Sequence, residues 1–223
     1  MKQTIVVDFD GTITQQDVFC LLLDRHGGLE GEKINQGYYD GTILPYQSLI
    51  DGMKVLSKNA CMSEISQTLD NEITIDPTFP AFILFCQKHN LEVRVVSCGI
   101  DWFIKRILDR CDLGHLPVHS AELHWNDHGP EVHIPHRDAG CAVSKGRFSL
   151  CKGRLIRGWQ AEGEFVTMIG DGASDFCGAK EADRVFARDA LITFCERQII
   201  PFTPVNSFQD VQEKFWASGK ELP

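Results

Sequence analysis

Residues 4–14 read TIVVDFDGTIT, and this stretch decides the fold because an apolar run ends there in a pair of carboxylates. The β-branched residues at 4–9 predict a short strand buried on both faces. The Asp10-Gly11 pair that follows is typical of a turn. Because Asp8 and Asp10 lie two positions apart, both side chains can lean toward the same face. We therefore expect a buried strand whose end carries two carboxylates.

Two later segments repeat this pattern of a β-branched run followed by a small or acidic turn. Residues 93–97 precede Cys98-Gly99, and residues 165–169 precede the GDG of residues 170–172. Helical patterns accompany these runs at 78–89, 101–112 and 174–182. Such alternation predicts an α/β fold with a Rossmann-like parallel sheet, whose ligands bind at the carboxyl ends of the strands. The three turns should therefore lie at one edge of the sheet.

The interval between the first and second predicted strands is much longer than a single crossover connection needs. It contains helical patterns near 16–26, 45–58 and 62–71. We expect an α/β core formed by residues 1–14 and 77–223, with an inserted helical subdomain over 15–76. A further change occurs over 115–143, where the strand-like pieces HSAELHW and EVHIP stand on either side of Gly129-Pro130 and predict a hairpin or an excursion from the sheet.

Composition narrows the classes of partner. The chain has 223 residues, with 22 basic against 31 acidic side chains and a formal charge of −9. Because no basic stripe is present, nucleic acid is not an expected partner. No signal-peptide pattern and no apolar run of about 18 residues appears, which favours a cytoplasmic protein without a membrane partner. A monomer and a homodimer both stay open. The nine cysteines occur singly without a C-x-x-C pair, which favours reduced, buried thiols.

Four carboxylates would meet at the predicted sheet edge: Asp8, Asp10, Asp171 and Asp175. Like charges this close need a cation, and an all-oxygen ligand set favours Mg²⁺. Taken alone, the first pair is equally compatible with a solvated turn. An EF-hand loop fits less well because Gly11 comes too early and no glutamate closes the loop.

The two carboxylates after the first strand can divide the work of phosphoryl transfer. Asp8 is placed to attack phosphorus and form an aspartyl-phosphate, and Asp10 can protonate the leaving oxygen and later activate water. Such a reaction also requires that the charge on the phosphoryl oxygens be neutralised by a metal, backbone N–H groups and a cation.

Two further segments are candidates for binding the phosphate. Ser97, Cys98 and Gly99 offer a small hydroxyl and backbone groups just before the helix predicted from Asp101, whose N-terminus favours anions. Lys152 begins the helical stretch CKGRLIRGW. Taken alone, each segment also fits an ordinary turn or a surface lysine.

The order of these motifs along the whole chain resembles the haloacid dehalogenase superfamily, and in particular its phosphatases. The shared motifs are D-x-D-G-T after the first strand, a serine after a middle strand, a lysine before a late strand and G-D-G-x-x-D after it. The resemblance implies that the inserted helices form a four-helix cap. It also implies these roles: Asp8 as nucleophile, Asp10 as acid and base, Ser97 and Lys152 as phosphate ligands, and Asp171 as a Mg²⁺ ligand with Asp175 beside it.

Within that superfamily the chain resembles the phosphoserine phosphatase-like subgroup. The segments DFDGTIT, CK before MIGDG, and FARD are similar to its methionine-salvage phosphatases. Asp17 stands where phosphoserine phosphatases have a cap glutamate, and no arginine lies between Arg25 and Arg94 to pair with a substrate carboxylate.

These departures favour a small hydroxylated or enol phosphate as the substrate, with phosphoserine, phosphocholine and phosphoethanolamine as alternatives. We expect Asp17 to accept a hydrogen bond from it, although a helix N-terminal role explains this residue equally well. The predicted apolar wall of the pocket consists of Phe19, Leu22, Leu23, Met53 and Leu56.

Other classes of protein are weaker explanations. A phosphoacceptor signalling domain needs its acceptor aspartate after a middle strand, where this chain has Ser97. A phosphosugar mutase on the same fold would pass the phosphoryl group to a sugar hydroxyl instead of water, and the choice between hydrolysis and transfer stays open. A catalytically silent binding protein would not need the complete acidic set. A structural metal held by Cys141, Cys151, His133 and His136 stays open as a separate hypothesis.

Overall fold

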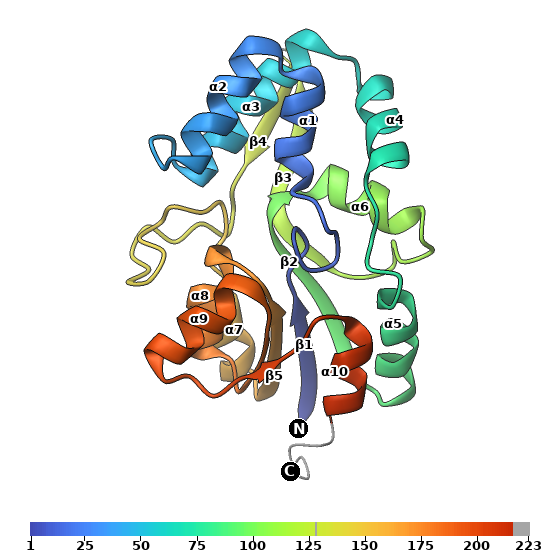
Figure 1. Ribbon diagram of the computed structural model, residues 1–223, viewed down its shortest axis with the longest axis vertical. Coiled ribbons are helices and arrows are strands. Elements are labelled where there is room, and N and C mark those ends of the chain that lie inside the picture. Colours follow the sequence, from blue (N-terminus) through green and yellow to red (C-terminus); the bar gives the residue numbers. More distant parts are fainter. Residues whose placement is uncertain (128, 216–223) are drawn as a thin grey trace.

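The centre of the protein is a mostly parallel sheet of seven strands (Figure 1). The computed structural model describes residues 1–127 and 129–215. The strand order is β4-β3-β2-β1-β5-β6-β7, and every neighbouring pair is parallel except β3 with β4. The predicted α/β fold with a parallel sheet is confirmed. The strands are β1 (Lys2–Val7), β2 (Glu92–Ile100), β3 (Val118–Asn126), β4 (Gly129–His133), β5 (Glu164–Gly170), β6 (Arg184–Ala187) and β7 (Thr203–Pro204).

Helices cover both faces of this sheet because side chains alternate along each strand. In β1, Ile5 and Val7 pack into one hydrophobic cluster with Phe79, whereas Val6 packs into another with Ile156. The first cluster lies under α5 (Phe79–Lys88), α6 (Asp101–Asp109) and α10 (Phe208–Phe215). The opposite side carries α7 (Lys152–Ala161), α8 (Phe176–Glu181) and α9 (Asp189–Gln198), as Figure 1 shows. Among the described residues, no helix is both long and apolar enough to cross a bilayer.

Four consecutive helices stand beyond the carboxyl end of β1 (Figure 1). They are α1 (Val18–His26), α2 (Gly28–Tyr39), α3 (Pro45–Asn59) and α4 (Met62–Glu72). The helical patterns near 16–26, 45–58 and 62–71 are confirmed. The residue pattern did not predict α2, because its sequence GLEGEKINQGYY contains three glycines, which are poor helix formers, and few apolar residues. The exact division into a core and a 15–76 subdomain stays a prediction.

The two chain passages between the sheet and these helices run side by side. Thr14 forms an isolated bridge with Ile75, and the amide of Asp76 donates to the carbonyl of Ile13 at 2.7 Å. The guanidinium of Arg110, which directly follows α6, donates to the carbonyl of Ile73, which directly follows α4, at 2.5 Å. These contacts therefore connect the four helices α1–α4 to the sheet domain close to the loop that carries Asp8 and Asp10.

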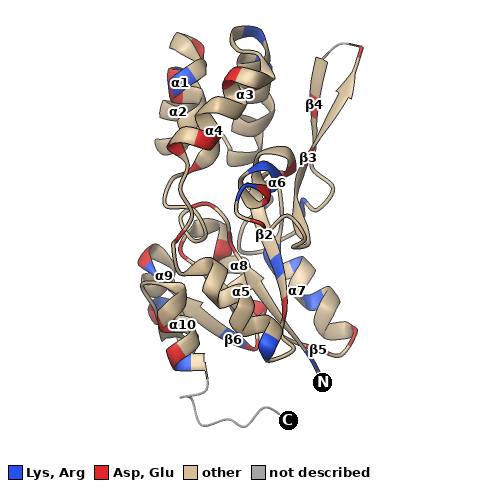
Figure 2. Ribbon diagram, turned by 90° about the vertical axis from the view of Figure 1, so that its right-hand side faces the viewer, with Lys and Arg blue, Asp and Glu red and all other residues tan. Residues whose placement is uncertain are grey.

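The predicted hairpin over 115–143 is present, but its turn is placed differently. Gly129 and Pro130 are the first residues of β4 and pair with Asn126 and Trp125 instead of separating the two strands. In addition, β3 joins the main sheet beside β2. Figure 2 shows the hairpin extending past the sheet beside the helices, and β4 contacts α3.

The turn predicted after residue 97 is wrong. Strand β2 continues to Ile100, so that Ser97, Cys98 and Gly99 lie on it. The pairing of β2 with β3 shifts in register between Val96 and Ile100, and this irregularity lets the strand continue while it bends out of regular pairing. The first strand shows the opposite difference, since β1 ends at Val7 and leaves Asp8 just beyond it.

Candidate active site

The loop after β1 brings the first carboxylate to the centre of the sheet edge. Strand β1 pairs with β2 on one side and β5 on the other, and the amide of Asp8 still donates to the carbonyl of Ile169 at 3.0 Å. Gly11 then turns the chain with φ of +77°, and a Cβ there would lie 2.5 Å from Asp171 Oδ2. Only glycine combines this backbone conformation with so close an approach of the second acidic motif.

The loop after β5 orients its two carboxylates differently. Asp175 is buried, and its Oδ2 accepts the amides of Asp171 and Gly172, both at 2.9 Å. Asp171 is only half-buried, and its Oδ1 accepts the Thr12 hydroxyl at 2.7 Å. Asp175 therefore holds the loop in shape, while Asp171 faces the first motif.

Lys152 lies beneath these carboxylates and is fully buried. Its Nζ lies 2.6 Å from Asp8 Oδ1 and 2.6 Å from Asp175 Oδ1. Burial alone would lower the pKa of Lys152, but the charges of Asp175 and Asp8 outweigh it and raise that pKa. The lysine is therefore a permanent cation that joins the two acidic motifs.

The site keeps an excess of negative charge. Burial raises the pKa of Asp8 well above its usual value, the charge of Asp175 adds to this, and Lys152 opposes it. Burial and Asp175 also raise the pKa of Asp171 to about 6. Carboxylate oxygens of Asp8, Asp171 and Asp175 lie within 4.8 Å of one another. Because Asp175 already uses both oxygens, this donor set fits a hard cation held chiefly by Asp8 and Asp171.

Asp10 stands between the sheet and the helices. Its Oδ1 accepts the amide of Val18, the first residue of α1, at 2.9 Å, and its Oδ2 accepts the Ser97 hydroxyl at 3.4 Å. Burial, followed by the charge of Asp17, raises the pKa of Asp10 to about 7. A carboxyl group with this pKa can both give and take a proton near neutral pH.

The three predicted phosphate-binding residues on β2 are divided between the interior and the cavity. Ser97 is fully buried and its Oγ accepts the amide of Gly99 at 2.9 Å. Cys98 and Gly99 line the cavity, and the Cys98 carbonyl accepts the Ser149 hydroxyl at 2.7 Å. Neither Ser97 nor Lys152 lines the cavity; both lie directly behind residues that do.

A cavity of about 240 Å³ opens above the carboxylates. Asp17 and Phe19 line it, as predicted, and Asp17 is also the N-cap of α1, accepting the Cys20 amide at 2.9 Å. Its other lining residues are Asp8, Asp10, Gly11, Cys20, Tyr38, Pro45, Ser48, Leu49, Cys98, Gly99, Phe148, Asp171, Gly172, Ala173 and Ser174. Within the described chain, the lining contains no lysine, arginine or histidine.

The predicted apolar wall is wrong in four of its five residues. Leu22, Leu23, Met53 and Leu56 are buried in the main hydrophobic cluster and do not reach the cavity. The apolar pattern shows that these residues face inward, but it does not show whether they face neighbouring helices or a cavity. Tyr38, Leu49 and Phe148 occupy the wall instead. No sequence signal marks Tyr38, because α2 lacks a clear apolar period.

The hypothesis of a metal held by two cysteines and two histidines is also wrong. The His133 ring stacks on His124 at 4.2 Å between centroids, and the His136 ring lies 5.8 Å from His119. Cys141 and Cys151 are close together, but their third neighbour is Cys177. The His136 carbonyl accepts the amide of Cys151 at 2.9 Å, but neither histidine ring belongs to the group that the three thiols form.

Comparisons with known proteins identify the family of the chain. The chain matches the family model described as Putative Phosphatase over residues 3–222. It is 32% identical over 216 residues to 2-hydroxy-3-keto-5-methylthiopentenyl-1-phosphate phosphatase of Bacillus cereus, covering 95% of each chain. It is 31% identical over 213 residues to the enzyme of the same name in Exiguobacterium sibiricum, again covering 95% of each. A substrate-bound phosphoserine phosphatase structure aligns with a TM-score of 0.69 at 19% identity, covering 96% of this chain and 98% of that one, which supports the fold.

Proposed function

The chain belongs to the Putative Phosphatase family and is a phosphatase of the haloacid dehalogenase type, and we propose that it hydrolyses a small phosphomonoester through a phosphorylated Asp8. The observation that carries this proposal is the position of Asp8, which lines the cavity while Lys152 holds its Oδ1 at 2.6 Å. A carboxylate fixed in this way can present its other oxygen to phosphorus.

The proposed cofactor is Mg²⁺. Asp8 and Asp171 would hold it, with Asp10 beside them and Asp175 fixing the loop that carries Asp171. Bound there, Mg²⁺ would neutralise charge on the phosphoryl oxygens. The raised pKa values of Asp8 and Asp171, caused first by burial and then by the charge of Asp175, support a cation at this place, because a bound cation would favour the ionised carboxylates.

The proposed reaction has two steps. Asp8 attacks phosphorus, and the bond to the leaving oxygen breaks as Asp10 gives that oxygen its proton. Asp10, now a carboxylate, then takes a proton from water, which attacks phosphorus and releases phosphate and free Asp8. A pKa of about 7 suits Asp10 for both proton transfers. We propose Ser97, Cys98, Gly99 and Lys152 as the surroundings of the phosphate.

The proposed substrate is 2-hydroxy-3-keto-5-methylthiopentenyl-1-phosphate, the compound named in the relatives' titles. Among the residues that the structure describes, no cationic side chain lines the cavity to pair with the carboxylate of phosphoserine. Its wall of Phe19, Leu49 and Tyr38 suits an apolar tail, and Asp17 can accept a hydrogen bond from a substrate hydroxyl.

A second candidate is a phosphate ester of a small amine. Asp17 together with the aromatic rings of Phe19, Tyr38 and Phe148 also suits an ammonium group, through its negative charge and cation–π contacts. Phosphocholine and phosphoethanolamine are the simplest esters of this kind.

Measured kcat/KM values for the enol phosphate, phosphoserine, phosphocholine and phosphoethanolamine test these assignments together. We expect the enol phosphate to exceed phosphoserine by at least tenfold, which corresponds to about 1.4 kcal/mol in transition-state binding. A tenfold preference for phosphoserine would refute the substrate assignment and leave the phosphatase chemistry in place. A tenfold preference for phosphocholine would select the second candidate.

A further inference from the structure

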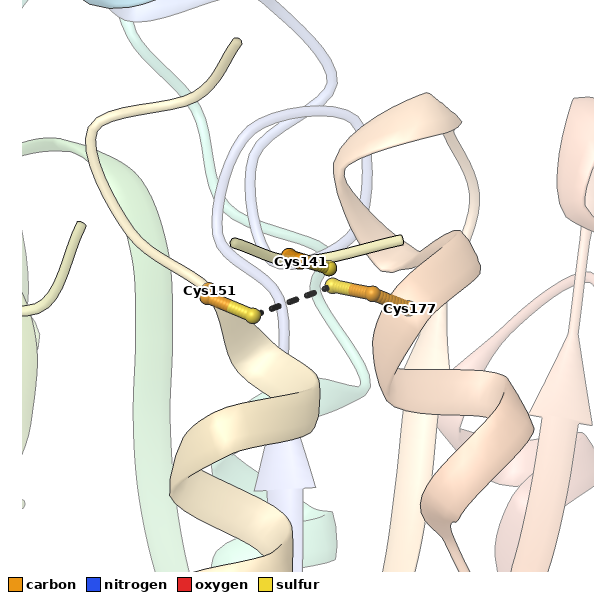
Figure 3. Close-up of side chains that lie close together, drawn as sticks. All are labelled: Cys141, Cys151 and Cys177. Carbon is orange, nitrogen blue, oxygen red and sulfur yellow. Dashed lines mark hydrogen bonds between the residues drawn. The ribbon is translucent and has the colours of Figure 1, made fainter. Parts of the chain in front are cut away.

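Three buried thiols from separate segments converge beside the active site. Cys141 lies in the loop after β4, Cys151 directly precedes α7, and Cys177 lies on α8. Their exposed fractions are 9%, 1% and 4%, and their Sγ atoms all lie within 4.8 Å of one another. Figure 3 shows the three side chains pointing toward one another.

The spacing of these sulfurs is that of atoms that share a metal ion. The Sγ atoms of Cys151 and Cys177 lie 3.9 Å apart. A tetrahedral zinc site with Zn–S bonds of about 2.3 Å places its sulfurs about 3.8 Å apart, whereas a disulfide requires about 2.05 Å. The sulfurs of Cys151 and Cys177 are therefore already at the separation of two zinc ligands and well beyond that of a disulfide.

The surroundings suit thiolate ligands. The amide of Ser144 donates to Cys141 Sγ at 3.4 Å, and such amide–sulfur contacts orient and stabilise a metal-bound thiolate. Val143 packs against the three thiols. Reduced cysteines can also pack as small apolar groups, but that role does not require three sulfurs to face one common point.

We propose that Cys141, Cys151 and Cys177 bind one thiophilic metal ion, with Zn²⁺ as its first candidate. Soft sulfur ligands select Zn²⁺ or Cu⁺ over Mg²⁺, so this site is chemically distinct from the carboxylate site. A fourth zinc ligand would come from outside these three residues.

The place of the thiols in the chain gives the ion a positioning role. Cys151 is adjacent to Lys152, and Cys177 follows Asp175 by two residues. An ion bound by both would fix the start of α7 relative to α8, and thereby the contact of 2.6 Å between Lys152 and Asp175. It would act through these residues without touching the substrate.

Metal binding by the full-length chain tests the proposal. The protein is stripped of metal, reduced, saturated with Mg²⁺ to occupy the carboxylates, and titrated with Co²⁺, whose thiolate charge-transfer absorption reports sulfur ligation directly. We expect one Co²⁺ per chain, displaced by Zn²⁺, and at least about tenfold weaker binding for Cys141→Ser, Cys151→Ser and Cys177→Ser. The matched control is Cys195→Ser, a fully buried cysteine in another cluster, which should bind normally.

Several outcomes would overturn the proposal. It fails if the reduced wild-type chain shows no charge-transfer band, or if Cys177→Ser binds as tightly as Cys195→Ser. If Cys151→Ser or Cys177→Ser does not fold, Cys141→Ala in the loop provides the same comparison, with circular dichroism as the test of folding. Because the readout is spectroscopic, its failure would leave the proposed phosphatase reaction untouched, and loss of activity alone would not refute the metal site.

Discussion

The two walls of the cavity differ in polarity and in the charged groups that they contain. The sheet wall contains Asp8, paired with a fully buried lysine and close to the loop that Asp175 holds in shape. The helix wall contains Tyr38 and Leu49 on neighbouring helices and has Asp17 as its charged residue. We therefore propose that the sheet wall carries out the chemistry, while the helix wall selects the group that is bound to the phosphate.

Asp10 is the residue that connects the two walls. It follows β1, yet its Oδ1 accepts the first amide of α1, and the charge of Asp17 contributes to its raised pKa. A displacement of α1 would therefore change the environment of the proposed proton donor. Binding at the helix wall and proton transfer at the sheet wall should be coupled through this residue.

The sharpest test of the sheet wall is Asp8→Asn. The amide keeps the size of the side chain but cannot act as the nucleophile, so kcat should fall by a factor on the order of 10⁴ or more. Phosphate release measures this loss, and Asp51→Asn on α3, outside the cavity, serves as the control. Near-normal activity of Asp8→Asn, with deamidation excluded by mass spectrometry, would show that Asp8 is not the nucleophile.

Replacement of Asp10 should have the next largest effect. We expect Asp10→Asn to lower kcat for alkyl phosphates by roughly 10²- to 10⁴-fold, because it removes the general acid. The loss should be much smaller for an aryl phosphate, whose leaving oxygen needs no proton. Equal losses for both esters would argue against this role for Asp10.

Lys152→Met tests the ion pairs below the sheet wall. Two buried carboxylates would lose their cation, which should destabilise the fold by roughly 3 kcal/mol at neutral pH. The double variant Lys152→Met/Asp175→Asn removes one of those carboxylates and should recover part of this loss. Chemical denaturation measures the free energy of unfolding of the single and the double variant. A single variant as stable as wild type would show that the pairs contribute nothing to the fold.

The part of the sheet wall built from local motifs could be predicted from the sequence. Asp8, Asp10 and Asp171 each follow a recognisable strand, and parallel strands bring their carboxyl ends to one edge. The helix wall was harder to predict, since the glycine-rich α2 that carries Tyr38 has no clear apolar period. The position of Cys177 beside Cys151 depends on how α8 packs against α7, which no local pattern contains.

A smaller effect should appear in the pH dependence of stability without metal. The folded-state pKa values of Asp10 and Asp171 are about 7 and about 6, above their usual 3.8, so the folded protein binds more protons than the unfolded chain between these limits. The stability that protonated Asp10 and Asp171 contribute to the folded state is complete below pH 3.8 and is lost as the pH rises through 6 and 7. The Tm of the wild type should therefore fall over this range relative to Asp10→Asn.

Mg²⁺ should oppose that loss, because a bound cation favours the ionised carboxylates. Partial burial lowers the pKa values of His119 and His136, so these two histidines act in the opposite direction near pH 6, which is why the comparison with Asp10→Asn is needed. If the Tm of the wild type and the Tm of Asp10→Asn depend on pH in the same way, Asp10 does not contribute to the pH dependence of stability.

The smallest expected effect tests the coupling between the walls through Asp17→Asn. Asparagine caps a helix as well as aspartate does, so the fold and the hydrogen bond to the Cys20 amide should be kept. The substitution removes the charge that helps to raise the pKa of Asp10. The alkaline limit of the kcat profile should therefore move to lower pH by less than about one unit, which corresponds to 1.36 kcal/mol. The change in kcat/KM also separates the substrates, since an amine ester should lose more than the enol phosphate. An unchanged pH profile would mean that the helix wall does not influence the proton donor, and that the two walls act independently.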